Sequence, residues 1–123
     1  MNIGIVAHDE MKDKLVDWVA RHASVLAEHS LYATGTTGQR VMERCQQLQV
    51  QLLKSGPLGG DQQLGAMICE GKLDALIFFI DPLSPHPHDV DIKALIRLVT
   101  LYNTLHAYNE STADLIIDSL RDH

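Results

Sequence analysis

Short apolar runs alternate with amphipathic stretches along the whole chain. The apolar runs predict five strands, at Asn2–Ala7, Leu31–Ala33, Val50–Leu53, Asp74–Ile80 and Leu105–Tyr108. The amphipathic stretches predict helices at Glu10–His29, Gln39–Gln47, Gln62–Gly71, Asp91–Tyr102 and Ser111–Leu120. This alternation is typical of the α/β class. We therefore expect one domain over residues 1–123, a three-layer doubly wound fold whose five-stranded parallel sheet carries helices on both faces.

Composition narrows the classes of function. The 123 residues are 46% hydrophobic and carry a net charge of −6, which disfavours non-specific binding to nucleic acid or to an anionic membrane. The longest apolar run, Ala75–Ile80, is too short to span a bilayer, and the chain opens on a strand rather than on a signal peptide. We expect a cytoplasmic protein in which Cys45 and Cys69 are free thiols.

Polar and glycine-rich segments follow the predicted strands and do not precede them. These segments are His8-Asp9, Thr34–Gly38, Ser55–Asp61 and Asp81–Asp89. In parallel α/β sheets, ligands bind outside the carboxyl ends of the strands. The unusual residues are therefore expected to gather at one edge of the sheet and to form one site there.

The segment Thr34–Gly38 has the composition of a phosphate-binding loop. Its glycines allow close approach of the backbone, its hydroxyls can donate hydrogen bonds, and a helix N-terminus is expected to follow. The alternative is a helix-capping turn. The chain lacks both G-x-G-x-x-G at this point and the P-loop lysine, so neither a dinucleotide nor a nucleoside triphosphate is favoured. Ser55 and Gly56 add donors at the same edge, and Lys12 adds a countercharge.

Asp61 follows two glycines at the start of a predicted helix, which allows two interpretations. It can be the N-cap of that helix, or it can be a reactive carboxylate in the site. A helix N-terminus stabilises the charged carboxylate and so weakens it as a base. A catalytic role requires opposing effects, namely burial and negative charge from a bound phosphate, Asp9 or Asp91.

The segment from His86 to Asp91 holds two imidazoles and acidic side chains. A metal site is disfavoured because Pro87 separates the histidines and no standard ligand spacing is present. The other interpretations are a helix start and a histidine that moves protons beside a carboxylate. The remaining histidines are expected to be structural or on the surface; they are His22, His29, His106 and His123.

Five segments together resemble the methylglyoxal synthase family, in order and with matching spacing over nearly the whole chain. They are Val6–Asp9, Tyr32–Gly38, Ser55–Gln63, Phe78–Leu83 and Pro87–Asp91. The resemblance implies an enzyme that converts dihydroxyacetone phosphate to methylglyoxal and inorganic phosphate, without a metal or organic cofactor. It also implies a homohexamer and inhibition by inorganic phosphate.

The resemblance further implies roles for individual residues. Asp61 would remove a proton from the hydroxyl-bearing carbon, and His88 would polarise the carbonyl oxygen and move protons. His8, Asp9 and Asp91 would surround the reacting atoms. The substrate phosphate would be held by Lys12, Thr34, Gly35, Thr36, Thr37, Ser55 and Gly56.

The chain departs from the family pattern in three places. Val90 replaces a proline, Asn103–Asn109 differs from the usual segment, and the sequence stops at His123 without the basic tail of longer members. The alternative function is a non-catalytic phosphometabolite-binding domain, as in the allosteric domain of carbamoyl phosphate synthetase. Such a domain needs no acid–base set, so the presence of Asp61 and His88 together with His8 and Asp91 favours an enzyme.

Overall fold

The computed structural model describes residues 1–84 and 89–121 and confirms the predicted alternation of strands and helices. The strands are β1 (Asn2–Ala7), β2 (Ser30–Thr34), β3 (Val50–Leu53), β4 (Ala75–Phe79) and β5 (Leu105–Ala107). The helices are α1 (Lys12–Arg21), α2 (Ala23–Leu26), α3 (Gly35–Arg44), α4 (Gly60–Cys69), α5 (Asp89–Leu101) and α6 (Glu110–Leu120). Two short 3₁₀ helices, η1 (Asp9–Met11) and η2 (Gly56–Leu58), follow β1 and β3.

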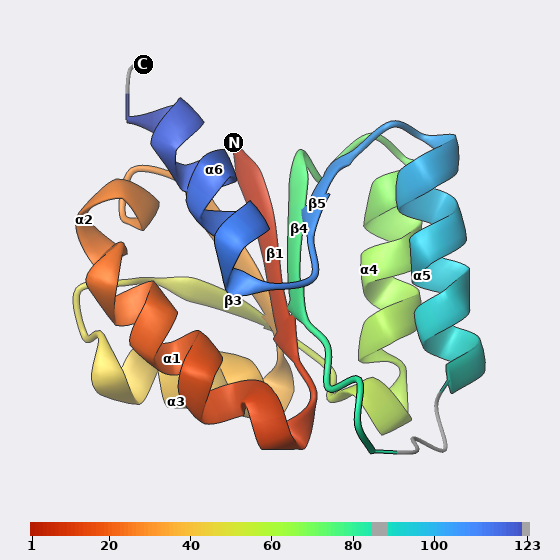
Figure 1. Cartoon of the computed structure of the whole chain (residues 1–123), viewed down its shortest axis with the longest axis horizontal. Helices are drawn as coiled ribbons and strands as arrows, with labels where there is room; N and C mark the ends of the chain where they lie inside the picture. The colour runs from red at the N-terminus through yellow and green to blue at the C-terminus, as the bar shows by residue number, and fades with distance from the viewer. Residues whose placement is uncertain (85–88, 122–123) are drawn as a thin grey trace.

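The strands form one parallel sheet in the order β3-β2-β1-β4-β5. Helices α1, α3 and α6 lie on one side of the sheet, and α4 and α5 lie on the other (Figure 1). The predicted three-layer doubly wound fold is therefore confirmed. From β1 the chain adds β2 and β3 on one side, and then β4 and β5 on the other side of β1. The boundary between β1 and β4 is the topological switch point, where such sheets bind their ligands.

Alternation along the central strands divides the core into two layers. Ile3 and Ile5 of β1 face the side covered by α1, α3 and α6, where Trp18 is fully buried. Val6 of β1 and Phe78 of β4 face the opposite side and pack with residues of α4 and α5. Both faces of β1 and β4 are thus covered, as expected for central strands of a parallel sheet. This covering fixes the carboxyl ends of the two strands next to each other.

Two helix boundaries differ from the prediction. The helix expected over Glu10–His29 is divided at His22, whose φ of −112° and ψ of 18° are not helical. The prediction of a loop over Thr34–Gly38 is wrong, because α3 begins directly at Gly35. Glycine and threonine are poor helix formers, but tertiary packing overrides that preference here. A side chain at Gly38 would lie 2.3 Å from Leu52 Cδ2, so the small residue lets α3 pack closely on the sheet.

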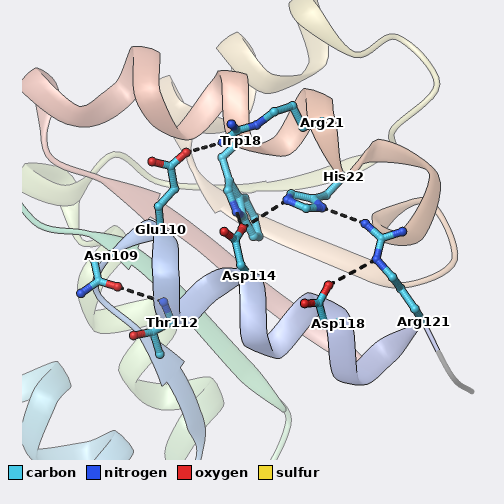
Figure 2. Close-up of polar contacts among 9 residues, drawn as sticks. All are labelled: Trp18, Arg21, His22, Asn109, Glu110, Thr112, Asp114, Asp118 and Arg121. Carbon is cyan, nitrogen blue, oxygen red and sulfur yellow. Dashed lines mark hydrogen bonds and ion pairs between the residues drawn. The ribbon is translucent and has the colours of Figure 1, made fainter.

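The last helix is attached to α1 by a polar cluster (Figure 2). Its N-cap is Asn109, whose side-chain oxygen accepts the Thr112 N–H at 3.0 Å, so the helix begins one residue before the predicted start at Ser111. The carboxylate of Asp114 accepts the indole N–H of Trp18 at 2.9 Å.

His22 belongs to the same cluster, since its Nε2 lies 3.3 Å from Asp114 Oδ1 and its Nδ1 contacts the guanidinium of Arg121. The sequence alone suggested no such partners for this histidine. The contacts join α6 to the end of α1 and give His22 a structural role.

The segment Asn103–Asn109, which departs from the family pattern, keeps a regular structure. Asn103 has a φ of 55°, and the following strand β5 pairs in parallel with β4. Val90, the other departure, is exposed in the first turn of α5. Cys45 is buried and Cys69 is exposed, and both are free thiols as predicted. Within residues 1–84 and 89–121, no helix is long and apolar enough to cross a membrane.

Candidate active site

A cavity of about 430 Å³ opens at the carboxyl ends of β1, β2 and β4, at the switch point of the sheet. Its polar lining consists of His8, Asp9, Lys12, Thr34, Thr36, Ser55, Gly56 and Asp61. Its apolar lining consists of Val6, Ala7, Pro57, Phe78 and Ile92. The polar residues come from three separate segments that the sheet brings together. The volume is suited to a small metabolite.

The phosphate-binding residues predicted from the sequence lie mainly on one part of this lining. Thr34 ends β2 and Thr36 lies in the first turn of α3, where backbone N–H groups without helical partners point outward. Gly35 and Thr37 share that turn but do not line the cavity. Thr37 is 1% exposed, and within the described chain its hydroxyl has no hydrogen-bond partner. This wall therefore offers hydroxyls together with a helix N-terminus.

Lys12 supplies positive charge to the same wall. Its Nζ lies 2.6 Å from Asp9 Oδ1, and its side chain is only 13% exposed, whereas that of Asp9 is 89% exposed. The ammonium group is therefore on the protein side of the pair, and the carboxylate is at the rim. An anion in the cavity could contact Lys12 while Asp9 stays in solvent.

Asp61 is buried in the first turn of α4, where its residue exposure is 8%. The N-cap of α4 is Gly59, and no side chain caps the helix, so the interpretation of Asp61 as the N-cap is wrong. A side chain at Gly56 would lie 3.6 and 3.7 Å from the two carboxylate oxygens of Asp61. The carboxylate therefore lies against the η2 turn, in the wall of the cavity.

The position of Asp61 depends on a close contact at the start of its helix. A Cβ at Gly60 would lie 1.9 Å from the carbonyl oxygen of Lys54 and 2.9 Å from Thr34 Cγ2. Only glycine allows α4 to begin this close to the ends of β2 and β3. The backbone N–H of Gly60 also donates to the Ser55 carbonyl at 2.9 Å, which closes the turn beneath Asp61.

His8 lines the cavity directly after β1, and β4 holds its ring in place. Its Nδ1 accepts the backbone N–H of Asp81 at 2.8 Å, and its ring meets Phe78 edge-on at 5.1 Å. Asp81 is itself buried, and its Oδ1 accepts the N–H of Leu83 at 3.0 Å. Asp81 was not among the predicted site residues. Its place at the end of the most apolar strand was the sequence signal that could have indicated it.

Asp91, another predicted site residue, does not line this cavity. Asp91 lies in the first turn of α5, where its Oδ1 accepts the Nε2–H of Gln62 at 2.9 Å. Together with Asp61, it lines a smaller cleft of about 240 Å³ between α4 and α5. His88 lies outside the described residues. Within residues 1–84 and 89–121, no group of three or more histidine, cysteine or acidic side chains is placed to hold a metal ion.

Tyr108 lies directly after β5, near this edge of the sheet, and its side chain is partly buried. Burial raises the pKa of its hydroxyl, which has no hydrogen-bond partner within the described part of the chain. Tyr108 packs against the layer that contains α4 and α5 and does not line the cavity. It therefore belongs to the packing around the site.

The fold and the cavity define an α/β domain with a small-molecule-sized cavity that combines hydroxyl and backbone donors, Lys12 and a buried carboxylate. The family model of the MGS-like domain matches residues 14–106, and the chain belongs to this family. It is 60% identical over 118 residues to methylglyoxal synthase of Oleidesulfovibrio alaskensis, a match that covers 96% of this chain and 80% of that protein. It is 56% identical over 118 residues to methylglyoxal synthase of Rhizobium rhizogenes, with 96% and 94% covered.

A solved structure agrees with these matches. The crystal structure of methylglyoxal synthase from Elizabethkingia anophelis superimposes with a TM-score of 0.89 at 51% identity, covering 94% of this chain and 76% of that chain. The predicted resemblance and the predicted enzyme class, a lyase, are therefore confirmed.

Proposed function

We propose that this chain converts dihydroxyacetone phosphate to methylglyoxal and inorganic phosphate. The main support is the juxtaposition, in one cavity, of the buried carboxylate of Asp61 with a wall of anion-binding groups around Lys12 and Thr36. The relatives named methylglyoxal synthase support the same reaction. We further propose that the chain acts as one domain in a cytoplasmic homohexamer, and that inorganic phosphate, the product, inhibits it.

The substrate phosphate would occupy the wall formed by the first turn of α3 and the η2 turn. Lys12, Thr34, Thr36, Ser55 and Gly56 line the cavity there. Backbone and hydroxyl donors at a helix N-terminus favour a dianion, and Lys12 adds a charge-assisted hydrogen bond. Gly35 and Thr37 would contribute through the backbone of the same turn. This arrangement would fix the phosphate and leave the three-carbon part of the substrate toward Asp61.

Asp61 would act as the general base. Its carboxylate takes a proton from the carbon that bears the hydroxyl group, and the electron pair of the C–H bond forms an enediolate. A carboxylate can remove such a weakly acidic proton only if nearby donors stabilise the developing oxyanion. We assign this stabilisation and the movement of protons between the oxygens to His88, with His8 beside the reacting atoms. Burial and the negative charges of the phosphate, Asp9 and Asp91 would maintain the basicity of Asp61.

The orientation of the phosphate would decide the product. If the C–O bond to phosphate lies in the enediolate plane, phosphate is retained and isomerisation follows. If the bond is perpendicular to that plane, it overlaps with the π system, the C–O bond breaks and phosphate leaves with the electron pair. The remaining enol becomes methylglyoxal by gaining a proton on carbon and losing the proton of its hydroxyl group. The rigid phosphate wall would therefore determine the reaction as well as the affinity.

The test is to incubate the purified chain with dihydroxyacetone phosphate and to measure methylglyoxal and inorganic phosphate separately. We expect both products in equal amounts. Binding of phosphate without turnover would instead favour the non-catalytic ligand-binding domain, and formation of glyceraldehyde phosphate would contradict the proposed orientation of the phosphate.

A further inference from the structure

The ring of His8 is held by backbone groups of β4 and the segment that follows it. The ring Nδ1 accepts the N–H of Asp81 at 2.8 Å, and the backbone N–H of His8 donates to the carbonyl of Phe79 at 3.2 Å, which fixes the main chain beside the ring. The edge-on contact with Phe78 restricts the ring further. Because the partner of Nδ1 is a main-chain N–H, the ring cannot turn over without breaking its hydrogen bond to Asp81.

The donor to Nδ1 determines which ring nitrogen carries the proton. A backbone N–H can only donate, so Nδ1 must present its lone pair. The ring proton of neutral His8 is therefore on Nε2. An imidazolium would place an N–H on Nδ1 against the N–H of Asp81, and both donors would lose their acceptor. The Asp81 N–H cannot easily turn away, because the buried Asp81 side chain closes a turn with the N–H of Leu83.

The charged groups around His8 have opposite effects on the stability of its imidazolium form. Among the described residues, Asp9, Asp61 and Asp81 provide carboxylates close to this part of the cavity, and Lys12 provides an ammonium group. The carboxylates favour an imidazolium, whereas Lys12 and the Asp81 N–H disfavour it. The N–H is in direct contact with Nδ1. Asp9 is largely in solvent and paired with Lys12. The Asp81 carboxylate accepts the N–H of Leu83, and Asp61 lies against the η2 turn. Contact with the backbone therefore has the stronger effect on the proton at Nδ1.

From this geometry we infer that His8 remains neutral during turnover and acts as a fixed hydrogen-bond donor through its Nε2–H. The inference deepens the proposed function and depends on it: the acceptor is the substrate oxygen that becomes negative as the enediolate forms. A donor already in place needs no reorganisation when that charge develops. His8 takes up no proton in the cycle, so the transfer of protons between the substrate oxygens belongs to other groups.

The first test reads the protonation of His8 without any turnover. Nitrogen spectra of the protein labelled with ¹⁵N-histidine are recorded between pH 8 and about pH 5.5, roughly one unit below the ordinary histidine pKa. The His8 signals are identified by their loss in His8→Gln. We expect the neutral form with the proton on Nε2 throughout. A proton on Nδ1 at any of these pH values, whether as the other tautomer or as an imidazolium, would overturn the inference.

The second test separates hydrogen-bond donation from proton transfer. Glutamine carries an N–H donor that does not titrate, whereas leucine carries no donor at all. We expect His8→Gln to keep kcat for dihydroxyacetone phosphate within about tenfold of the wild type, and His8→Leu to lose roughly 100-fold or more, the effect of one lost donor to an oxyanion. Equal losses in the two variants would contradict a donor role.

The two tests also distinguish this inference from the proposed function. If the wild type turns over dihydroxyacetone phosphate but His8 is an imidazolium at pH 5.5, only the inference fails. If the wild type produces no methylglyoxal, the proposed function fails, and the spectra still determine whether Nδ1 of His8 accepts the Asp81 N–H.

Discussion

Replacement of Gly60 by alanine should displace Asp61 without changing any polar group of the cavity. The added Cβ would lie 1.9 Å from the Lys54 carbonyl oxygen, whereas carbon and oxygen atoms in contact need roughly 3.5 Å. The start of α4 and the end of β3 must therefore separate by about 1.6 Å. If both elements move equally, Asp61 shifts by about 0.8 Å away from the phosphate wall.

A displacement of this size is enough to affect the chemistry strongly. Misplacement of a reacting group by about 1 Å can cost roughly 100-fold in rate. Overpacking of this kind typically costs about 1–3 kcal/mol of unfolding free energy. We therefore expect Gly60→Ala to fold, to lose about 100-fold in kcat, and to be moderately less stable than the wild type.

Gly71→Ala is a matched control at the other end of the same helix. Gly71 has a φ of +70°, so alanine is strained there by about 1–2 kcal/mol, but no atom outside its chain neighbours lies within 4 Å of the added Cβ. Stability is measured by urea unfolding and activity by methylglyoxal formation. Both variants should lose stability, and only Gly60→Ala should lose kcat. A Gly60→Ala enzyme with kcat within threefold of the wild type would refute the reasoning.

Three further predictions concern separate parts of the molecule. Lys12→Ala should weaken inhibition by inorganic phosphate by about tenfold, which is the effect of losing one charge-assisted hydrogen bond. An unchanged inhibition constant would show that Lys12 is not part of the phosphate wall. Cys69 should react with a thiol reagent in the native protein, whereas Cys45 should react only on unfolding. Burial raises the pKa of the Cys45 thiol and so lowers its thiolate fraction at a given pH. Equal labelling rates for the two cysteines would contradict this prediction. Asp114→Ala should lower the unfolding free energy by about 1 kcal/mol because the buried Trp18 indole N–H loses its acceptor. Asp114→Asn keeps an acceptor oxygen and should retain most of that free energy. Identical urea midpoints for the two variants would argue against the contact.

The sequence was sufficient to predict the fold because most strands and helices have a clear hydrophobic period. It also predicted much of the cavity, since parallel strands place their carboxyl ends together and the hydroxyl- and glycine-rich segments follow them. Thr34, Thr36, Ser55 and Gly56 were found in this way and do line one cavity. What they hold there stays a prediction.

Tertiary contacts account for the features that the sequence did not predict. The first turn of α3 has poor helix formers, and the close packing of Gly38 against the sheet is a tertiary contact that the local sequence does not reveal. The bond between the Asp81 N–H and His8 joins residues 73 positions apart, and it exists because β1 pairs with β4. The side-chain contact between Gln62 and Asp91 likewise depends on how α4 packs against α5.

The central claim is that Asp61 is the base in a cavity whose phosphate site is independent of it. The most direct measurement compares Asp61→Asn with the wild type, using methylglyoxal formation for turnover and calorimetry for the binding of inorganic phosphate. Asparagine has nearly the same shape but cannot accept the proton. We predict that turnover falls below detection while phosphate affinity changes by less than about tenfold, or 1.4 kcal/mol. An Asp61→Asn protein with wild-type turnover would contradict the account.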